Sequence, residues 1–141
     1  MSARIRDKTA ELERFADELA GIAPDSYLSY SRDLKAKAAC ERYFEKIVEA
    51  CVDLAFLAIK DRGLKLPEDD KQAFSVLADA GLIDTSLATR LMEAKGMRNV
   101  IAHEYGSVDD ELVFSAVTEE IERDSRAFLK AMRRLYPGKL Q

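Results

Sequence analysis

The sequence predicts an all-α protein, an up-and-down bundle of about five helices. Helix-forming residues such as Ala, Leu, Glu, Lys and Arg are abundant, whereas the 141 residues include only 6 glycines and 3 prolines. Apolar residues recur at spacings of three and four along most of the chain, and no segment alternates apolar and polar residues for long enough to form a strand. A chain of this length without a linker-like segment is typical of one domain, which we expect to span residues 1–141.

The first half of the chain predicts two long helices, each with one apolar face. Residues 3–20 should form the first helix, after which Gly21 and Pro24 interrupt the pattern. A short turn capped by Asp25 or Ser26 should precede the second helix, residues 31–60. The apolar stripes consist of Ile5, Leu12, Phe15 and Leu19 in the first helix, and of Cys40, Phe44, Ile47, Cys51, Leu54, Ala55 and Ala58 in the second.

The second half predicts three more helices. Residues 68–79 should form a short helix that Gly81 stops. The fourth helix should begin at a cap within residues 84–86 and close at Gly106, and the last should run from Asp109 to the Pro137-Gly138 pair, with an acidic outer side. The predicted buried residues are Phe74, Val76 and Leu77 in the third helix, Leu87, Leu91, Met97, Val100 and Ile101 in the fourth, and Leu112, Val113, Ala116, Val117, Ile121, Phe128, Met132 and Leu135 in the last.

Composition and charge narrow the class of protein. No apolar run approaches the roughly 20 residues that cross a bilayer, and the first residues lack the apolar segment of a secretory signal. We therefore expect a cytoplasmic protein that has no membrane partner. The net charge of −4 argues against broad coating of nucleic acid but is compatible with a local basic pocket.

The sequence predicts neither a metal site nor a cofactor. A single histidine and no CxxC pair leave too few ligands for a metal. Cys40 and Cys51 would lie about 16 Å apart along one helix, which is too far for a disulfide within the chain. We expect two buried free thiols.

The segment from Arg98 to Tyr105 carries the candidate chemistry. It contains His103, the only histidine, and histidine exchanges protons near neutral pH. Arginine presents a planar fork of donors that matches a phosphate. On an ideal helix His103 lies about 140° around the axis from Arg98, so the two side chains border a face rather than converge. Two such helices related by a two-fold axis could gather both pairs around one phosphate, which predicts a homodimer.

These residue types are sufficient to cleave RNA without a metal. His103 would act as general base toward the ribose 2′-hydroxyl or as general acid toward the leaving 5′ oxygen. Arg98 would stabilise the charge that builds on the phosphoryl oxygens. Asn99 is placed to hydrogen-bond the ring of His103, and Tyr105 to stack on a base or bond a phosphate. The alternative is that a lone helical histidine is a packing or surface residue.

The motif resembles that of the HepT branch of the HEPN superfamily, whose signature is Arg, four residues, His, any residue, Tyr. The likeness is specific over residues 96–105 and Val108-Asp109, and weaker at residues 41–42, 49–53 and 77–83. It implies a small all-helical, HEPN-like ribonuclease toxin that acts as a homodimer with Arg98 and His103 at the interface. It also implies a cognate antitoxin, an MntA-like nucleotidyltransferase that adds AMP to the motif tyrosine, here Tyr105.

Two other hypotheses remain open at this point. The chain could be a non-catalytic helical dimer that binds a nucleotidyltransferase and never cuts RNA, or a degenerate enzyme that keeps only the fold. Arg42, Glu49 and Asp53 share one side of the second helix, and we interpret them as a surface ion-pair row in preference to support for an active site.

Overall fold

The computed structural model describes residues 3–103 and 109–137. This part of the chain is helical and contains no strand, which confirms the predicted all-α class. The elements are α1 (Ala3–Ile22), α2 (Tyr27–Arg32), α3 (Leu34–Asp61), α4 (Asp70–Asp79), α5 (Thr85–His103), α6 (Asp110–Ser115), the π-helical turn η1 (Ala116–Glu120) and α7 (Ile121–Leu135).

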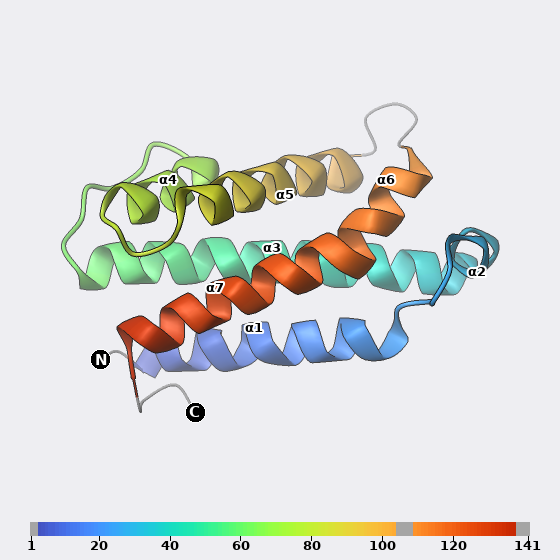
Figure 1. Ribbon diagram of the computed structural model, residues 1–141, viewed down its shortest axis with the longest axis horizontal. Coiled ribbons are helices and arrows are strands. Elements are labelled where there is room, and N and C mark those ends of the chain that lie inside the picture. Colours follow the sequence, from blue (N-terminus) through green and yellow to red (C-terminus); the bar gives the residue numbers. More distant parts are fainter. Residues whose placement is uncertain (1–2, 104–108, 138–141) are drawn as a thin grey trace.

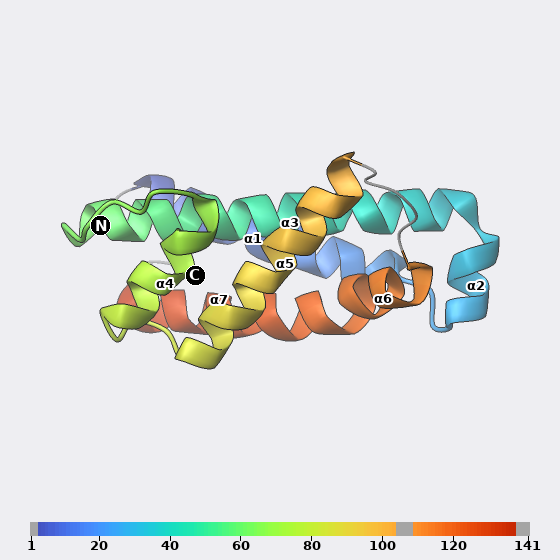
Figure 2. The ribbon, with the colours of Figure 1, turned by 90° about the horizontal axis from the view of Figure 1, so that it is seen from above.

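Helix α3 is the central element of an up-and-down bundle (Figure 1). It packs against α1, α4, α5 and α7, and the successive long helices α1, α3, α5 and α7 run in alternate directions. Seen from above, α5 crosses the bundle obliquely, from the side of α7 to the side of α3 (Figure 2). The first half of α5 therefore meets α7, whereas its second half, which carries the motif, meets α3.

The long helix α3 begins later than the sequence predicted. Asp33 has an extended backbone (φ −113°, ψ 96°) that separates α2 from α3. Its carboxylate accepts hydrogen bonds of 3.1 Å from the backbone amides of Lys35 and Ala36. An aspartate that satisfies the first free amides of a helix is a favourable N-cap, so α3 starts at Leu34 rather than at Ser31.

Side-chain caps begin three other helices. Ser26 caps α2, and Asp109 caps α6 through bonds of 2.9 and 3.3 Å to the next turn, so both predicted caps are confirmed. Asp69 caps α4 by accepting the backbone amide of Gln72 at 2.9 Å. The third predicted helix consequently begins at Asp70, two residues later than expected.

The core is continuous through the bundle. Phe74 of α4 and Phe128 of α7 are both fully buried, and their rings meet edge-on with centroids 6.0 Å apart. The predicted stripes of the two long N-terminal helices are buried, apart from Phe15, which is only partly covered. Other large, fully buried side chains include Ile5, Leu12, Tyr30, Phe44, Ile47, Leu54, Ile59, Leu77, Leu91 and Ile121.

A π-helical turn interrupts the last helix, where the sequence predicted a regular α-helix. Residues 116–120 join α6 to α7 without a break, and Thr118 Oγ1 donates a 2.6 Å hydrogen bond to the carbonyl of Phe114. A π turn accommodates an extra residue, so the positions that follow are rotated relative to an uninterrupted α-helix.

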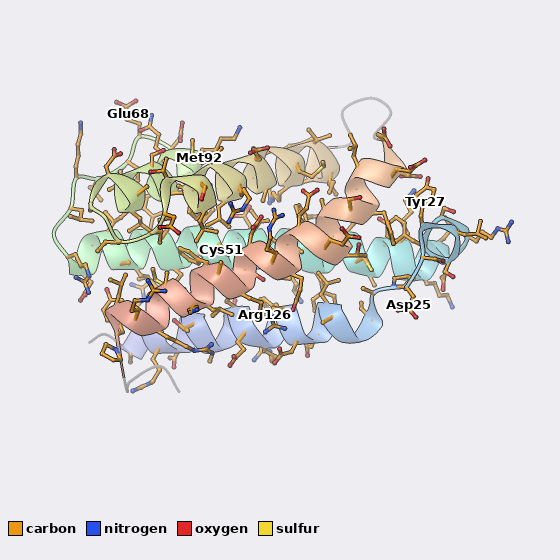
Figure 3. The ribbon with its side chains drawn as sticks, viewed as in Figure 1. Asp25, Tyr27, Cys51, Glu68, Met92 and Arg126 are labelled. Carbon is orange, nitrogen blue, oxygen red and sulfur yellow. The ribbon has the colours of Figure 1, made fainter. Side chains whose placement is uncertain are left out.

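The prediction that the acidic residues of the last helix lie on its outer side is wrong for Asp124 of α7. Its side chain is buried, and Oδ1 lies 2.8 Å from Arg90 Nε of α5 and 2.8 Å from Arg123 Nε. Arg126 of α7, labelled in Figure 3, lies 2.8 Å from Asp17 of α1. Ion pairs thus join α7 to two neighbouring helices.

Both cysteines are free and fully buried, as the sequence predicted. Cys51 lies within the bundle (Figure 3), and burial raises the pKa of its thiol far above the usual range. Burial also raises the pKa of the Cys40 thiol. The folded protein therefore holds both thiols in the neutral form.

Raised thiol pKa values should make the protein less stable at alkaline pH. The unfolded chain loses its thiol protons above about pH 9, whereas the folded protein keeps them, so the free energy of unfolding should fall by up to about 1.4 kcal/mol per pH unit for each thiol. Urea unfolding at pH 8, 9 and 10 measures the slope. Cys51→Ala should flatten it, and an unchanged slope in that variant would contradict the assignment.

None of the helices in the described residues is long and apolar enough to cross a membrane.

Candidate functional site

Helix α5 places the candidate residues in its last two turns. Arg98 and Asn99 are partly buried, and His103 is exposed as the last residue of the helix. Tyr105, the fourth predicted site residue, lies outside the described residues. His103 and Arg98 are therefore both within reach of solvent, as a substrate-binding pair requires.

The guanidinium of Arg98 is held on two sides. Its Nε is buried and lies 2.7 Å from Glu49 Oε1 of α3, in an ion pair whose N–H is not aligned for a regular hydrogen bond. Its Nη1 donates a 3.3 Å hydrogen bond to Asn99 Oδ1. The side chain keeps 24% of its surface exposed, so it can still meet a ligand.

Lys95 occupies the turn of α5 before Arg98. Its Nζ lies 2.8 Å from the same oxygen, Glu49 Oε1, and 3.3 Å from Asp70 Oδ2 at the start of α4. The side chain is only 8% exposed, whereas those of Glu49 and Asp70 are 34% and 48% exposed. A buried ammonium is tolerated only with such partners, because removing a charge from water is costly.

The interpretation of Arg42, Glu49 and Asp53 as one row of surface ion pairs on α3 is wrong for Glu49. The three residues of that row point to different partners: Arg42 to Glu45, at 3.8 Å, Asp53 to Lys8, at 3.4 Å, and Glu49 to α5. Glu49 is thus the member that contacts the predicted site.

Sequence reasoning missed the pairing of Lys95 with Glu49, although a signal for it exists. Lys95 continues the four-residue spacing of Leu87 and Leu91, both of which are buried. A charged residue in register with a buried apolar stripe requires an opposite charge from a neighbouring helix.

Arg98 and His103 are five residues apart on α5, a spacing that corresponds to about 140° around the axis of an α-helix. Arg98 is directed to Glu49 on α3, whereas His103 is exposed at the end of α5.

Two grooves of about 690 Å³ flank this region. One lies between α5 and the α6–η1–α7 segment and includes Met97, Val100 and the Arg90–Asp124 pair in its wall. The other lies between α1 and α3 and includes Glu49 and Asp70. In the described part of the chain, no group of three or more His, Cys, Asp or Glu residues is placed to hold a metal ion.

Comparison with known proteins gives one relative that matches most of the chain and another that matches about half of it. The "mRNA nuclease HepT" of Shewanella oneidensis is 24% identical over 122 residues, which are 86% of this chain and 91% of that protein. A "putative RNase" of Archaeoglobus fulgidus is 39% identical over 72 residues, so that match spans only about half of either protein (51% and 54%).

Solved structures share the fold. A tri-AMPylated HEPN toxin of Shewanella oneidensis, in complex with MNT antitoxin, superposes with a TM-score of 0.87 at 22% identity, over 95% of this chain and 99% of that one. YutE, a cytosolic protein of unknown function from Bacillus subtilis, gives a TM-score of 0.79 at 13% identity, over 98% and 92% of the two chains.

The family assignment comes from a family model rather than from these pairwise likenesses. The model described as "Ribonuclease HepT-like" matches residues 5–132, which include most of α1 and α7, all the helices between them, and both Arg98 and His103. The chain belongs to the ribonuclease HepT-like family.

Proposed function

We propose that this chain is the ribonuclease toxin of a toxin–antitoxin pair and that it cuts RNA without a metal, through Arg98 and His103 at the interface of a homodimer. The observation that carries the proposal is how the side chains of Arg98 and His103 are held and how far they are exposed. Arg98 is anchored by Glu49 and Asn99 and remains partly exposed, and His103 is exposed on the same helix. The ribonuclease names of relatives support the same activity.

The reaction is an internal transesterification. The ribose 2′-oxygen forms a bond to the adjacent phosphorus, and the bond from phosphorus to the 5′ oxygen of the next nucleotide breaks. His103 accepts the proton of the 2′-hydroxyl or donates a proton to the 5′ oxygen, and Arg98 stabilises the charge on the phosphoryl oxygens. The products carry a 2′,3′-cyclic phosphate and a 5′-hydroxyl. DNA is not cut because it lacks the nucleophile.

A homodimer would bring arginine and histidine side chains from two protomers into one cleft. The five-residue spacing of Arg98 and His103 on α5 predicts that, within a protomer, they border a face of the helix rather than converge. A two-fold axis near the end of α5 would bring two arginines and two histidines to one cleft, so that one histidine acts as the base and the other as the acid. We place this dimer in the cytoplasm, where RNA is available.

The nuclease proposal predicts cleavage of purified RNA in excess EDTA. The wild-type protein should be a dimer in light scattering and should yield RNA fragments with 2′,3′-cyclic phosphate ends. Arg98→Ala should reduce the cleavage rate on the order of 100–1000-fold. Loss of activity on adding EDTA would rule out the metal-free mechanism. If the wild-type protein and the variant are equally inactive, the chain is the non-catalytic binding partner instead, and an active monomer would rule out the shared site.

We also propose that an MntA-like nucleotidyltransferase antitoxin neutralises the protein by AMPylation of Tyr105. The HEPN toxin with the same fold is tri-AMPylated and bound to an MNT antitoxin. The tyrosine hydroxyl would attack the α-phosphorus of ATP and displace pyrophosphate. Negative phosphates two residues from His103 would occupy the cations that otherwise bind RNA.

AMPylation of Tyr105 should appear as a gain of whole AMP units in the intact mass after co-expression with an MntA-like nucleotidyltransferase. Tyr105→Phe removes the acceptor hydroxyl and should abolish the gain while the protein remains folded. The modified wild-type protein should also lose RNA cleavage. The same mass gain in the wild-type protein and in Tyr105→Phe would show that a residue other than Tyr105 is modified.

A further inference from the structure

A single carboxylate oxygen connects the two cations of α5. Glu49 Oε1 lies 2.7 Å from Arg98 Nε and 2.8 Å from Lys95 Nζ. Lys95 and Arg98 are three residues apart and therefore occupy adjacent turns on one side of the helix. The carboxylate comes from α3, so this contact fixes the motif end of α5 to the central helix.

The contact determines which part of Arg98 can bind a phosphate. A guanidinium has five N–H groups: one on Nε and two on each terminal nitrogen. Nε is buried against Glu49, and one N–H of Nη1 is bonded to Asn99. Within the described residues, no hydrogen bond occupies the other N–H of Nη1 or the two on Nη2. The terminal edge, with one N–H from each terminal nitrogen, can therefore donate two parallel hydrogen bonds to a phosphate.

Lys95 determines the net charge of the cluster that it forms with Glu49 and Arg98. A carboxylate paired with Arg98 alone would cancel the positive charge that a phosphate needs. Since Lys95 shares the same oxygen, Glu49, Lys95 and Arg98 together keep one net positive charge. Asp70 lies farther from Lys95 than Glu49 does, at 3.3 Å against 2.8 Å, and is more exposed, so it offsets less of the positive charge of Lys95 than Glu49 does.

We propose that Glu49 and Lys95 are positioning residues for Arg98, an inference that rests on the proposed nuclease function. Glu49 holds the Nε side of the guanidinium so that the terminal edge faces the scissile phosphate. Lys95 balances Glu49 so that this edge remains positive. Neither residue needs to touch the reacting atoms.

Removing Glu49 alone would leave Lys95 buried without its closest partner, so the test uses the paired change Glu49→Gln with Lys95→Met. The pair removes both charges at similar volume and should keep the protein folded. Because the anchor of Arg98 is lost, kcat should fall on the order of 10–100-fold while KM changes by less than about threefold. Lys95→Met alone leaves Glu49 paired with Arg98 only, so KM should rise more than kcat falls.

Asp124→Asn is the matched control. Asp124 Oδ1 is likewise shared by two cations at 2.8 Å, those of Arg90 and Arg123, and Arg90 is also on α5. This variant should lose stability, as any broken buried ion pair does, but keep its kcat at temperatures where it is folded. An equal loss of kcat in Asp124→Asn and in the double variant would show that Glu49 is only structural and would overturn the proposal.

A second measurement does not depend on RNA cleavage. In ¹⁵N-labelled protein, the Arg98 Nε–H signal, assigned by its loss in Arg98→Lys, should exchange slowly with water and broaden or disappear in the double variant. An unchanged signal would overturn the positioning role. If the wild-type protein cuts no RNA, the nuclease function fails, and this signal alone decides whether Glu49 holds Arg98. A double variant as active as the wild-type protein would overturn the proposal while leaving the nuclease function intact.

Discussion

Replacing His103 with alanine should abolish RNA cleavage and leave the fold almost unchanged. His103 is exposed at the last position of α5, so its removal creates no cavity in the core. Exposed substitutions alter stability by about 0.5 kcal/mol, and a histidine at a helix C-terminus contributes at most about 1 kcal/mol when charged. Loss of a general acid–base group costs about 100–10,000-fold in rate, and more when both protomers lose it.

The measurement pairs cleavage rate with melting temperature. Thr89→Ala is a suitable control because Thr89 is also exposed on α5, two to three turns before the motif. It should retain both activity and stability. A drop of many degrees in His103→Ala would identify the histidine as a structural residue, and cleavage at the wild-type rate would remove it from the mechanism.

The helices and the motif could be predicted because their signals are local. Apolar spacing, together with caps such as Ser26 and Asp109, identifies a helix within a few residues. Asp33 was missed as a boundary because an aspartate also fits the surface of a long helix, and only the fold selects its capping conformation. The π turn at residues 116–120 has no distinctive local composition.

The anchor of Arg98 could not be predicted because it joins helices that are far apart in sequence. Glu49 and Arg98 meet only because α5 crosses α3 obliquely, and helix crossing is determined by packing over the whole interface. The motif thus predicts which groups carry out the chemistry. The pairing of α3 with α5 determines which edge of the Arg98 guanidinium is available. We therefore expect the family signature alone, without this pairing, to be insufficient for activity.

Replacing Phe74 with alanine should cause the largest loss of stability among the substitutions considered. Phe74 is fully buried and packs edge-on against Phe128, so it joins α4 to α7 through the core. Truncating a buried phenylalanine removes its apolar contacts and leaves a cavity, at a cost of about 3–5 kcal/mol. That is a large share of the 5–15 kcal/mol that is typical of a domain. Urea unfolding measures the loss directly.

Phe56→Ala provides the comparison for Phe74→Ala. Phe56 is only partly buried at the edge of the groove between α1 and α3, so the same truncation should cost about half as much or less. Phe74→Ala should still cleave RNA at temperatures well below its melting point, because Arg98 and His103 belong to α5 and Glu49 to α3. Loss of cleavage in the folded variant would show instead that α4, through Asp70 and Lys95, takes part in holding the site.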